Sequence, residues 1–98
     1  MNITNEKATH ELVISMPENL NLAYYKIFRG LYQNTKGKFS DYVIDFGNTK
    51  KVELCLFGML LQLNEYVGTK ARIHLINCSR EMKLVFTISL LNEKFDVR

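Results

Sequence analysis

Hydrophobic and polar positions along the chain follow two periods, one typical of strands and one typical of helices. Short apolar runs predict strands in ELVISM (residues 11–16), DYVIDF (41–46) and ARIHLINC (71–78), because each is rich in β-branched or aliphatic side chains and is bounded by polar sequence. Residues 1–4 are expected to pair with the first run through the polar turn NEKATH. The closing FDVR is long enough only for a short edge strand.

Three longer segments between these strands have helical spacing. The first follows Pro17 and Asn19 and ends in NTKGK, where Gly37 is free to adopt a left-handed conformation. The second, residues 52–68, is apolar on nearly every side and should be largely buried. The third follows Ser79, a favourable N-cap residue. The predicted inward faces are Leu20, Ala23, Tyr24, Ile27, Phe28 and Leu31 in the first helix, and Met82, Val85, Phe86, Ser89 and Leu90 in the third.

The order of these elements predicts the fold class. Strands and helices alternate, which implies right-handed crossovers and a sheet that is largely parallel. We therefore expect an α/β fold with a four- to five-stranded, mostly parallel or mixed sheet and about three helices mainly on one face. DYVIDF and ARIHLINC should be central strands, because their aliphatic content suits burial on more than one side. Residues 1–98 are expected to form a single domain.

Composition narrows the class of protein further. The chain has 98 residues, 47% of them hydrophobic, which suffices for one modest core. A net charge of +3 is too weak a bias to indicate nucleic acid or an anionic membrane as a partner. No apolar run approaches the roughly 18 residues of a membrane span. Cys55 and Cys78 have no metal-ligand spacing and the N-terminus has no signal pattern, so reduced thiols in the cytoplasm are expected.

Two segments, YVIDFGNTKKVELCLFGMLLQL and ARIHLINCSREMKLVFTISLLNEKFDV, carry a family resemblance. They resemble the STAS domain of bacterial anti-sigma factor antagonists, in which an apolar strand ending in Asp-Leu is followed by a short loop, Asp-Ser-Ser-Gly-Leu-Gly and an aliphatic helix. Here Asp45 and Phe46 match the strand end, Glu53 stands at the motif Asp, and Gly58 stands at its second Gly. The aliphatic run is matched by residues 59–61, and the similarity in pattern and spacing covers most of the chain.

The departures from the family pattern concern its regulatory switch. In regulatory members the second motif Ser is phosphorylated by a partner kinase, and phosphorylation breaks the protein complex. Leu54 and Cys55 stand at the two Ser positions here, and Leu56 stands at the first Gly, so a Ser/Thr kinase has no hydroxyl to use at either site. The resemblance thus implies a segment with the shape of a switch but without the phosphorylatable residue.

The resemblance implies a non-catalytic protein-interaction module that binds a regulatory partner without phosphorylation at the usual Ser position. That partner would be an anti-sigma factor, a histidine-kinase-like ATPase or a multiprotein sensory assembly. An accessory STAS subunit of a membrane transport complex, docked at the cytoplasmic face, is the alternative. The contact surface is expected in the loop 48–52 and the first helical turn 53–58. Its residues are Asn48, Thr49, Lys50, Lys51, Glu53, Leu54, Cys55 and Gly58.

Several of these residues have two interpretations. Cys55 near a helix N-terminus is a candidate redox sensor, although a buried inert thiol is the commoner case. Thr49 is a weak phosphorylation candidate or a plain turn residue. Lys50 and Lys51 would meet an acidic partner or simply form a solvated basic turn. Leu54 is either partly exposed for protein contact or packed under the preceding loop.

Enzyme chemistry, cofactors and metals have little support in the sequence. The chain has no GxxxxGKS phosphate loop, no GxSxG and no HExxH. His10 and His74 lie far apart in sequence with no cluster of Cys, Asp or Glu around either, so no metal site is expected, and His74 is predicted to be a half-exposed packing residue. Neither a cofactor nor a nucleic-acid partner is predicted, and the oligomeric state is left open.

Overall fold

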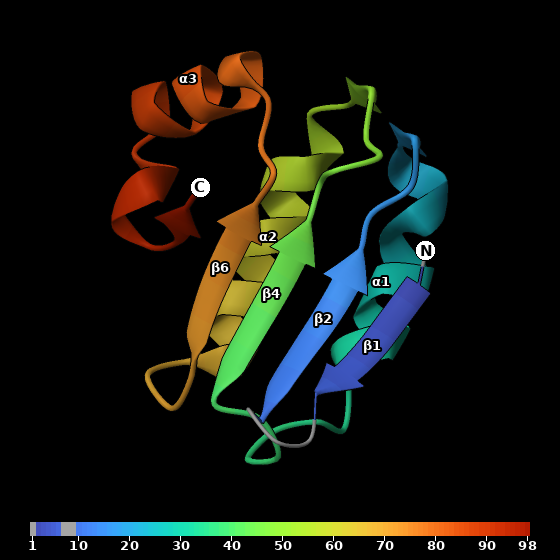
Figure 1. The fold of residues 1–98 in the computed structure, drawn as a ribbon, viewed down its shortest axis with the longest axis vertical. Coiled ribbons are helices and arrows are strands. Elements are labelled where there is room, and N and C mark those ends of the chain that lie inside the picture. Colours follow the sequence, from blue (N-terminus) through green and yellow to red (C-terminus); the bar gives the residue numbers. More distant parts are fainter. Residues whose placement is uncertain (1, 7–9) are drawn as a thin grey trace.

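A five-stranded sheet runs through the computed structural model, which describes residues 2–6 and 10–98 (Figure 1). Within these residues the strand order is β1-β2-β4-β6-β7, and β3 and β5 form a separate two-stranded sheet. The strands are β1 (Asn2–Glu6), β2 (Glu11–Ser15), β3 (Asn19–Leu20), β4 (Asp41–Asp45), β5 (Lys51–Val52), β6 (Arg72–Ile76) and β7 (Asp96–Val97). The helices are α1 (Tyr25–Tyr32), α2 (Cys55–Val67) and α3 (Arg80–Ile88), with 3₁₀ turns η1 (Leu22–Tyr24) and η2 (Leu91–Glu93).

The predicted fold class is confirmed. Strand β1 pairs antiparallel with β2, whereas β2, β4, β6 and β7 pair in parallel. DYVIDF and ARIHLINC supply β4 and β6, which both have a strand on either side, as their aliphatic content predicted. The expected pairing of the N-terminal segment with ELVISM is also present, with Asn2 opposite Ser15. Met1 and most of the predicted NEKATH turn lie outside the described residues.

The main sheet has one covered face and one open face. Helices α1 and α2 lie behind the sheet in Figure 1, and the viewer looks onto the uncovered face. Strands β2 and β6 alternate as this arrangement requires, with Leu12, Ile14, Ile73 and Leu75 buried toward the helices. The core is completed from α2 by Leu56, Met59, Leu60, Leu63 and Val67. Burying one such side chain contributes about 1.5–3 kcal/mol before conformational entropy is counted.

The predicted inward face of the first helix is partly wrong. The α-helix begins only at Tyr25, and its buried residues are Phe28 and Tyr32, whereas Ile27 is 52% exposed and Ala23 is exposed. Aromatic packing explains the difference. The Phe28 and Tyr32 rings meet edge to face with centroids 5.3 Å apart, so the two large rings occupy the stripe toward the sheet and Ile27 lies on its solvent side.

The third helix is less buried than its pattern predicted. Phe86 is buried and Met82 is half-buried, but Val85 and Leu90 are 42% and 61% exposed, and Ser89 is exposed. The reason is position, because α3 lies beyond the end of β6 and does not cover the sheet face (Figure 1). A helix in this place brings one row of side chains to the core, and that row is centred on Phe86.

The corrected face of α1 can be tested with two neighbouring residues. Phe28→Ala removes a side chain that is 1% exposed and should lower the free energy of unfolding by about 3–5 kcal/mol through the lost burial and the cavity left behind. Ile27→Ala should change it by less than about 1 kcal/mol. Urea unfolding followed by circular dichroism measures both. Equal losses in the two variants would contradict the observed orientation of α1.

Candidate functional site

The predicted contact loop lies at the carboxyl end of the parallel strands. Strands β2, β4 and β6 point the same way in Figure 1, so the segment after β4 and the segment between β6 and α3 emerge at the same end of the sheet. Ligand-binding loops of parallel sheets gather at this end. The geometry therefore brings the loop before α2 next to α3, although the two are well separated in sequence.

The carboxylate of Asp45 joins these two segments. Its Oδ1 accepts hydrogen bonds from the Gly47 backbone N–H at 2.8 Å and from the Asn77 side-chain amide at 2.9 Å. The Phe46 N–H donates to the Ile76 carbonyl at 3.1 Å beside them. A Cβ atom at position 47 would stand 3.1 Å from Asp45 Oδ1, so a larger residue would press on the carboxylate and displace it by a few tenths of an ångström.

The small β3–β5 sheet holds the loop from its other side. The backbone N–H groups of Lys50 and Lys51 both donate to the Glu18 carbonyl, at 2.8 and 3.1 Å, and the Glu53 N–H donates to the Leu20 carbonyl at 3.1 Å. Val52 belongs to β5 because of this pairing. Helix α2 consequently begins at Cys55 and not at residue 52, where the apolar pattern predicted its start.

The start of α2 presents the residues that replace the motif serines. Leu54 is 82% exposed, so of the two interpretations of this residue the structure has the exposed one. Cys55 is half-buried and packs against the core, and Leu56 is buried. Glu53 and Gly58 are exposed on either side of this turn. Of the predicted contact residues, Asn48, Lys50, Lys51, Glu53, Leu54 and Gly58 are exposed, whereas Thr49 and Cys55 are partly buried.

A groove of about 310 Å³ separates this turn from α3. Apolar side chains of Leu54, Phe57, Met82 and Val85 line it together with charged groups at Lys50, Glu53 and Glu81. The remaining lining residues are Thr49, Val52, Leu56, Ser79 and Phe86. The groove is therefore a mixed surface with an apolar floor, built from two loops and two helices, and we call it the α2–α3 groove.

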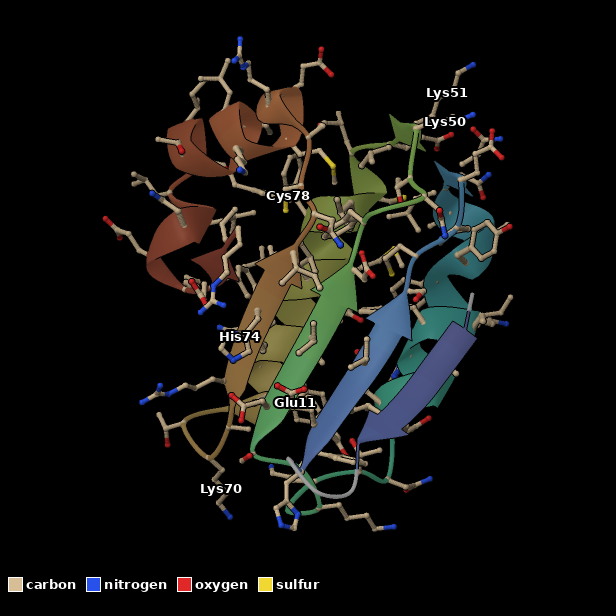
Figure 2. All side chains as sticks on the ribbon, viewed as in Figure 1. Glu11, Lys50, Lys51, Lys70, His74 and Cys78 are labelled. Atoms are coloured by element: carbon tan, nitrogen blue, oxygen red, sulfur yellow. The ribbon has the colours of Figure 1, made fainter. Side chains whose placement is uncertain are left out.

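The two lysines of the loop differ in their surroundings. Lys50 Nζ lies 3.5 Å from a carboxylate oxygen of Glu18, and both side chains are mostly exposed, so this ion pair contributes at most about 1 kcal/mol to stability. Lys51 is exposed as well. Figure 2 shows both lysines at the carboxyl end of the sheet, at the edge of the loop.

The hydroxyl of Thr49 is enclosed within the loop. Its Oγ1 is buried and has no hydrogen-bond partner among the described residues. A buried hydroxyl without a partner carries a desolvation cost of about 1–3 kcal/mol. Phosphorylation of Thr49 would require the loop to open, because a kinase cannot reach this oxygen in the observed conformation.

The two cysteines are free thiols. Burial raises the pKa of the Cys78 thiol to about 11, so Cys78 is held in its neutral and unreactive form at physiological pH.

Ser79, the next residue, caps α3 as predicted, with its hydroxyl oxygen accepting the Met82 N–H at 3.1 Å. That residue therefore acts in folding α3, at the edge of the α2–α3 groove.

A second cluster of polar side chains was missed by the sequence analysis: His74 is partly exposed, as predicted, but it also contacts two carboxylates. On the open face of the sheet, His74 Nε2 lies 2.7 Å from Asp41 Oδ1, and Nδ1 lies 2.8 Å from Asp96 Oδ2. The alternation of β6 could have placed His74 on this face, but its partners are 33 and 22 residues away in sequence. Within residues 2–6 and 10–98, no group of His, Cys, Asp and Glu is arranged to hold a metal ion.

Comparisons with known proteins agree on one kind of domain. A STAS-domain containing protein of Pseudomonas aeruginosa (strain UCBPP-PA14) is 30% identical over 88 residues, which cover 89% of this chain and 87% of that protein. The solved structure of the phosphorylated form of the Bacillus cell fate determinant SpoIIAA has the same fold, with a TM-score of 0.75 at 18% identity over 99% of this chain and 91% of that chain. No protein-family model matches the chain. No helix in the described part of the chain has the length and apolar character needed to cross a membrane.

Gly47, in the loop after β4, and Gly58, in α2, give a matched test of the Asp45 hydrogen bonds. Gly47→Ala should lower the free energy of unfolding by about 1 kcal/mol, the size of one hydrogen bond, because Asp45 Oδ1 cannot retreat from the new methyl group without leaving its donors. Gly58→Ala should raise it by roughly 0.5–1 kcal/mol, since alanine favours helix and no described heavy atom lies within 4 Å of the added Cβ. Denaturant midpoints at equal m-values measure both changes. A Gly47→Ala protein as stable as the wild type would show that the Asp45 hydrogen bonds contribute little to the free energy of unfolding.

Proposed function

The chain belongs to the STAS-domain family, as its resemblance predicted, and from this premise we propose that it is a non-catalytic module that binds a regulatory protein through the α2–α3 groove. The proposed partner is an anti-sigma factor, a kinase-like ATPase or a component of a sensory assembly in the cytoplasm. Binding is proposed to proceed without phosphorylation at the usual Ser position. The observation that carries the proposal is the exposed Leu54 at the edge of an apolar groove.

Exposed apolar side chains gather at this groove. Val52, Leu54 and Val85 are 37%, 82% and 42% exposed, and all three line it. Single exposed aliphatic residues need no explanation, but several around one concave surface are typical of protein contact sites. A partner side chain placed between Leu54 and Val85 would remove apolar surface from water on both proteins.

The charges at the groove indicate the chemistry of the partner. Glu53 and Glu81 line it, whereas Lys50 is already close to Glu18. An apolar anchor flanked by a basic side chain fits this arrangement, because the basic group would meet the two glutamates. The hydrogen bonds that fix the loop before binding reduce the conformational entropy that complex formation would otherwise cost.

The side chains at the groove support a role in binding without catalysis. The Ser79 hydroxyl oxygen already accepts the Met82 N–H as a helix cap, and the Thr49 hydroxyl is enclosed. Among the described residues that line the groove, no hydroxyl or thiol is hydrogen-bonded to a histidine or carboxylate that could activate it. A nucleophile paired with a base is the usual minimum for covalent catalysis.

Leu54→Asp tests the proposed surface. It should weaken partner capture at least tenfold, about 1.4 kcal/mol, while leaving the free energy of unfolding within about 1 kcal/mol, because Leu54 is exposed. Glu53→Lys should also weaken capture, because it reverses one of the two charges that the basic group of the partner would meet. Ile27→Asp, on α1, is the matched control for an exposed apolar residue and should bind normally. Quantitative mass spectrometry after pull-down from native lysate compares the three variants. Full binding by both Leu54→Asp and Glu53→Lys would place the functional surface elsewhere.

Phosphorylation should not control the complex. Leu54 and Cys55 offer no hydroxyl, and the Thr49 hydroxyl is buried. Incubation of the captured complex with ATP and the cognate kinase, followed by intact-mass and peptide analysis, should leave this loop unmodified and the complex intact. Stoichiometric phosphate on Thr49 together with dissociation is the result that would overturn this expectation, since a phosphate adds a charge of about −1.5 to −2 at the contact surface.

A further inference from the structure

Three strands are connected by side chains at one point on the open face of the sheet. His74 of β6 contacts Asp41 of β4 through Nε2, at 2.7 Å, and Asp96 of β7 through Nδ1, at 2.8 Å. The imidazole is 17% exposed, so it is mostly shielded from water. Figure 2 shows His74 on β6, on the sheet face that α1 and α2 leave uncovered.

The chemistry of these contacts requires a particular protonation state. An ionised carboxylate only accepts hydrogen bonds, and a neutral imidazole has one N–H donor and one bare nitrogen. With a neutral ring, one of the two carboxylates would face a nitrogen lone pair at less than 3 Å. Both contacts are therefore satisfied together when the ring carries both protons.

Other groups hold the two carboxylates in their charged form. The Ser40 hydroxyl donates to Asp41 Oδ2 at 2.9 Å, and Arg98 Nη2 lies 2.8 Å from Asp96 Oδ2. The hydrogen bond from His74 and then that from Ser40 lower the pKa of Asp41. The hydrogen bond from His74, followed by the contribution of Arg98, outweighs desolvation and lowers the pKa of Asp96.

The strand at the outer end of this cluster has few other attachments. Strand β7 has two residues and, among the described strands, pairs with β6 alone. The Arg98 N–H donates to the Leu75 carbonyl at 2.7 Å, and the Cys78 N–H donates to the Arg98 carbonyl at 3.3 Å. A strand this short depends on side-chain contacts such as that of Asp96 for a larger share of its stability than a long strand does.

We propose that Asp41, His74 and Asp96 form a pH-sensitive clasp, which ties the C-terminal strand β7 to β4 and β6 while the His74 ring carries both protons. Loss of one ring proton to solvent removes one of the two hydrogen bonds and leaves a carboxylate facing a lone pair. The clasp then loosens at its outer contact, because Asp96 belongs to the short edge strand whereas Asp41 belongs to a central strand.

Charged groups from every neighbouring element surround the clasp. Arg72 is on β6 and lies opposite Asp41 in the β4–β6 register, and Glu11 of β2 lies opposite Asp41 on the other side. Arg98 contacts Asp96 directly. Glu93 and Lys94, from the turn before β7, line the same surface hollow as His74. Of the charged residues described here, only Asp41 and Asp96 are hydrogen-bonded to the His74 ring.

The pH range in which the clasp is closed follows from the directions in which the pKa values of His74, Asp41 and Asp96 are shifted. Burial, the largest single contribution, favours the neutral ring, but the hydrogen bonds from Asp41 and Asp96 together outweigh it and raise the pKa of His74. A raised pKa means that the contribution to stability is lost as the pH rises through the folded-state pKa of His74. The lowered pKa values of Asp41 and Asp96 mean that their contribution is lost as the pH falls through those values. The clasp is therefore closed at pH values above the pKa values of the two carboxylates and below the pKa of His74.

NMR on the intact chain tests the clasp directly. The ring C–H signal of His74 should titrate above its ordinary pKa of 6.5. Across the same pH interval, the hydrogen-exchange protection factor of the Arg98 amide, corrected for intrinsic rate, should fall about threefold or more relative to that of Met16, whose amide donates to the Asp45 carbonyl within the central strands. Titration at or below 6.5, or a constant ratio of the two protection factors, overturns the proposal.

Variants that replace one charged side chain by a neutral amide distinguish the hydrogen bonds of the clasp from the general effect of nearby charges. Asp96→Asn and Asp41→Asn should each lower the pKa of His74, whereas Glu11→Gln, which removes the same charge from the same face, should shift it by less than half as much. His74→Gln should abolish the pH dependence of Arg98 protection. An equal effect of Glu11→Gln, or pH-dependent protection that persists in folded His74→Gln, would count against the clasp. Should His74→Gln fail to fold, the three carboxylate variants still decide the question.

Discussion

The hydrogen bonds accepted by the Asp45 carboxylate are the contacts on which the α2–α3 groove depends. Parallel pairing of β4 with β6 places Asp45 opposite Ile76, and so places the next residues of both strands side by side. A single oxygen then accepts from Gly47 on one segment and Asn77 on the other. Because Asn77 leads into α3 and Gly47 leads into the loop before α2, this oxygen helps set the distance between the two walls of the α2–α3 groove. Aspartate suits this position because its side chain is short and one carboxylate oxygen can accept two hydrogen bonds.

A sheet covered on one face has consequences for both of its surfaces. With α1 and α2 behind the sheet, the open face must satisfy its own polar groups, and His74 does so by bridging Asp41 and Asp96. Helix α3 lies past the end of the strands and buries little more than one row of side chains. Its exposed Val85 is then available to line the groove. The incomplete burial of α3 and the apolar character of the groove thus have the same structural cause.

Sequence patterns predicted those parts of the structure that are determined by the residues of a single segment. The apolar runs of β4 and β6 and the Ser79 cap are of this kind. The start of α2 was placed too early because Val52 is held by Leu20, which its own segment does not reveal. The inner face of α1 depends on ring packing against other elements. The His74 cluster depends on register across three strands, and a single sequence carries no direct signal of such pairing.

The groove is lined by α3 itself, whereas the clasp lies beyond the C-terminal end of this helix. Phe86 ties α3 to the groove side, with its ring centroid 6.4 Å from that of Phe46 and 6.2 Å from that of Phe57. The clasp holds the chain only after α3 has ended, at Asp96. The three aromatic rings all lie outside β7, whereas the carbonyl of Arg98, next to β7, accepts a hydrogen bond from the Cys78 N–H, one residue before the Ser79 cap of α3. A protonation event can shift a conformation only by the difference in its interactions with the two states. For the clasp, that difference lies at the contact between His74 and Asp96 of β7.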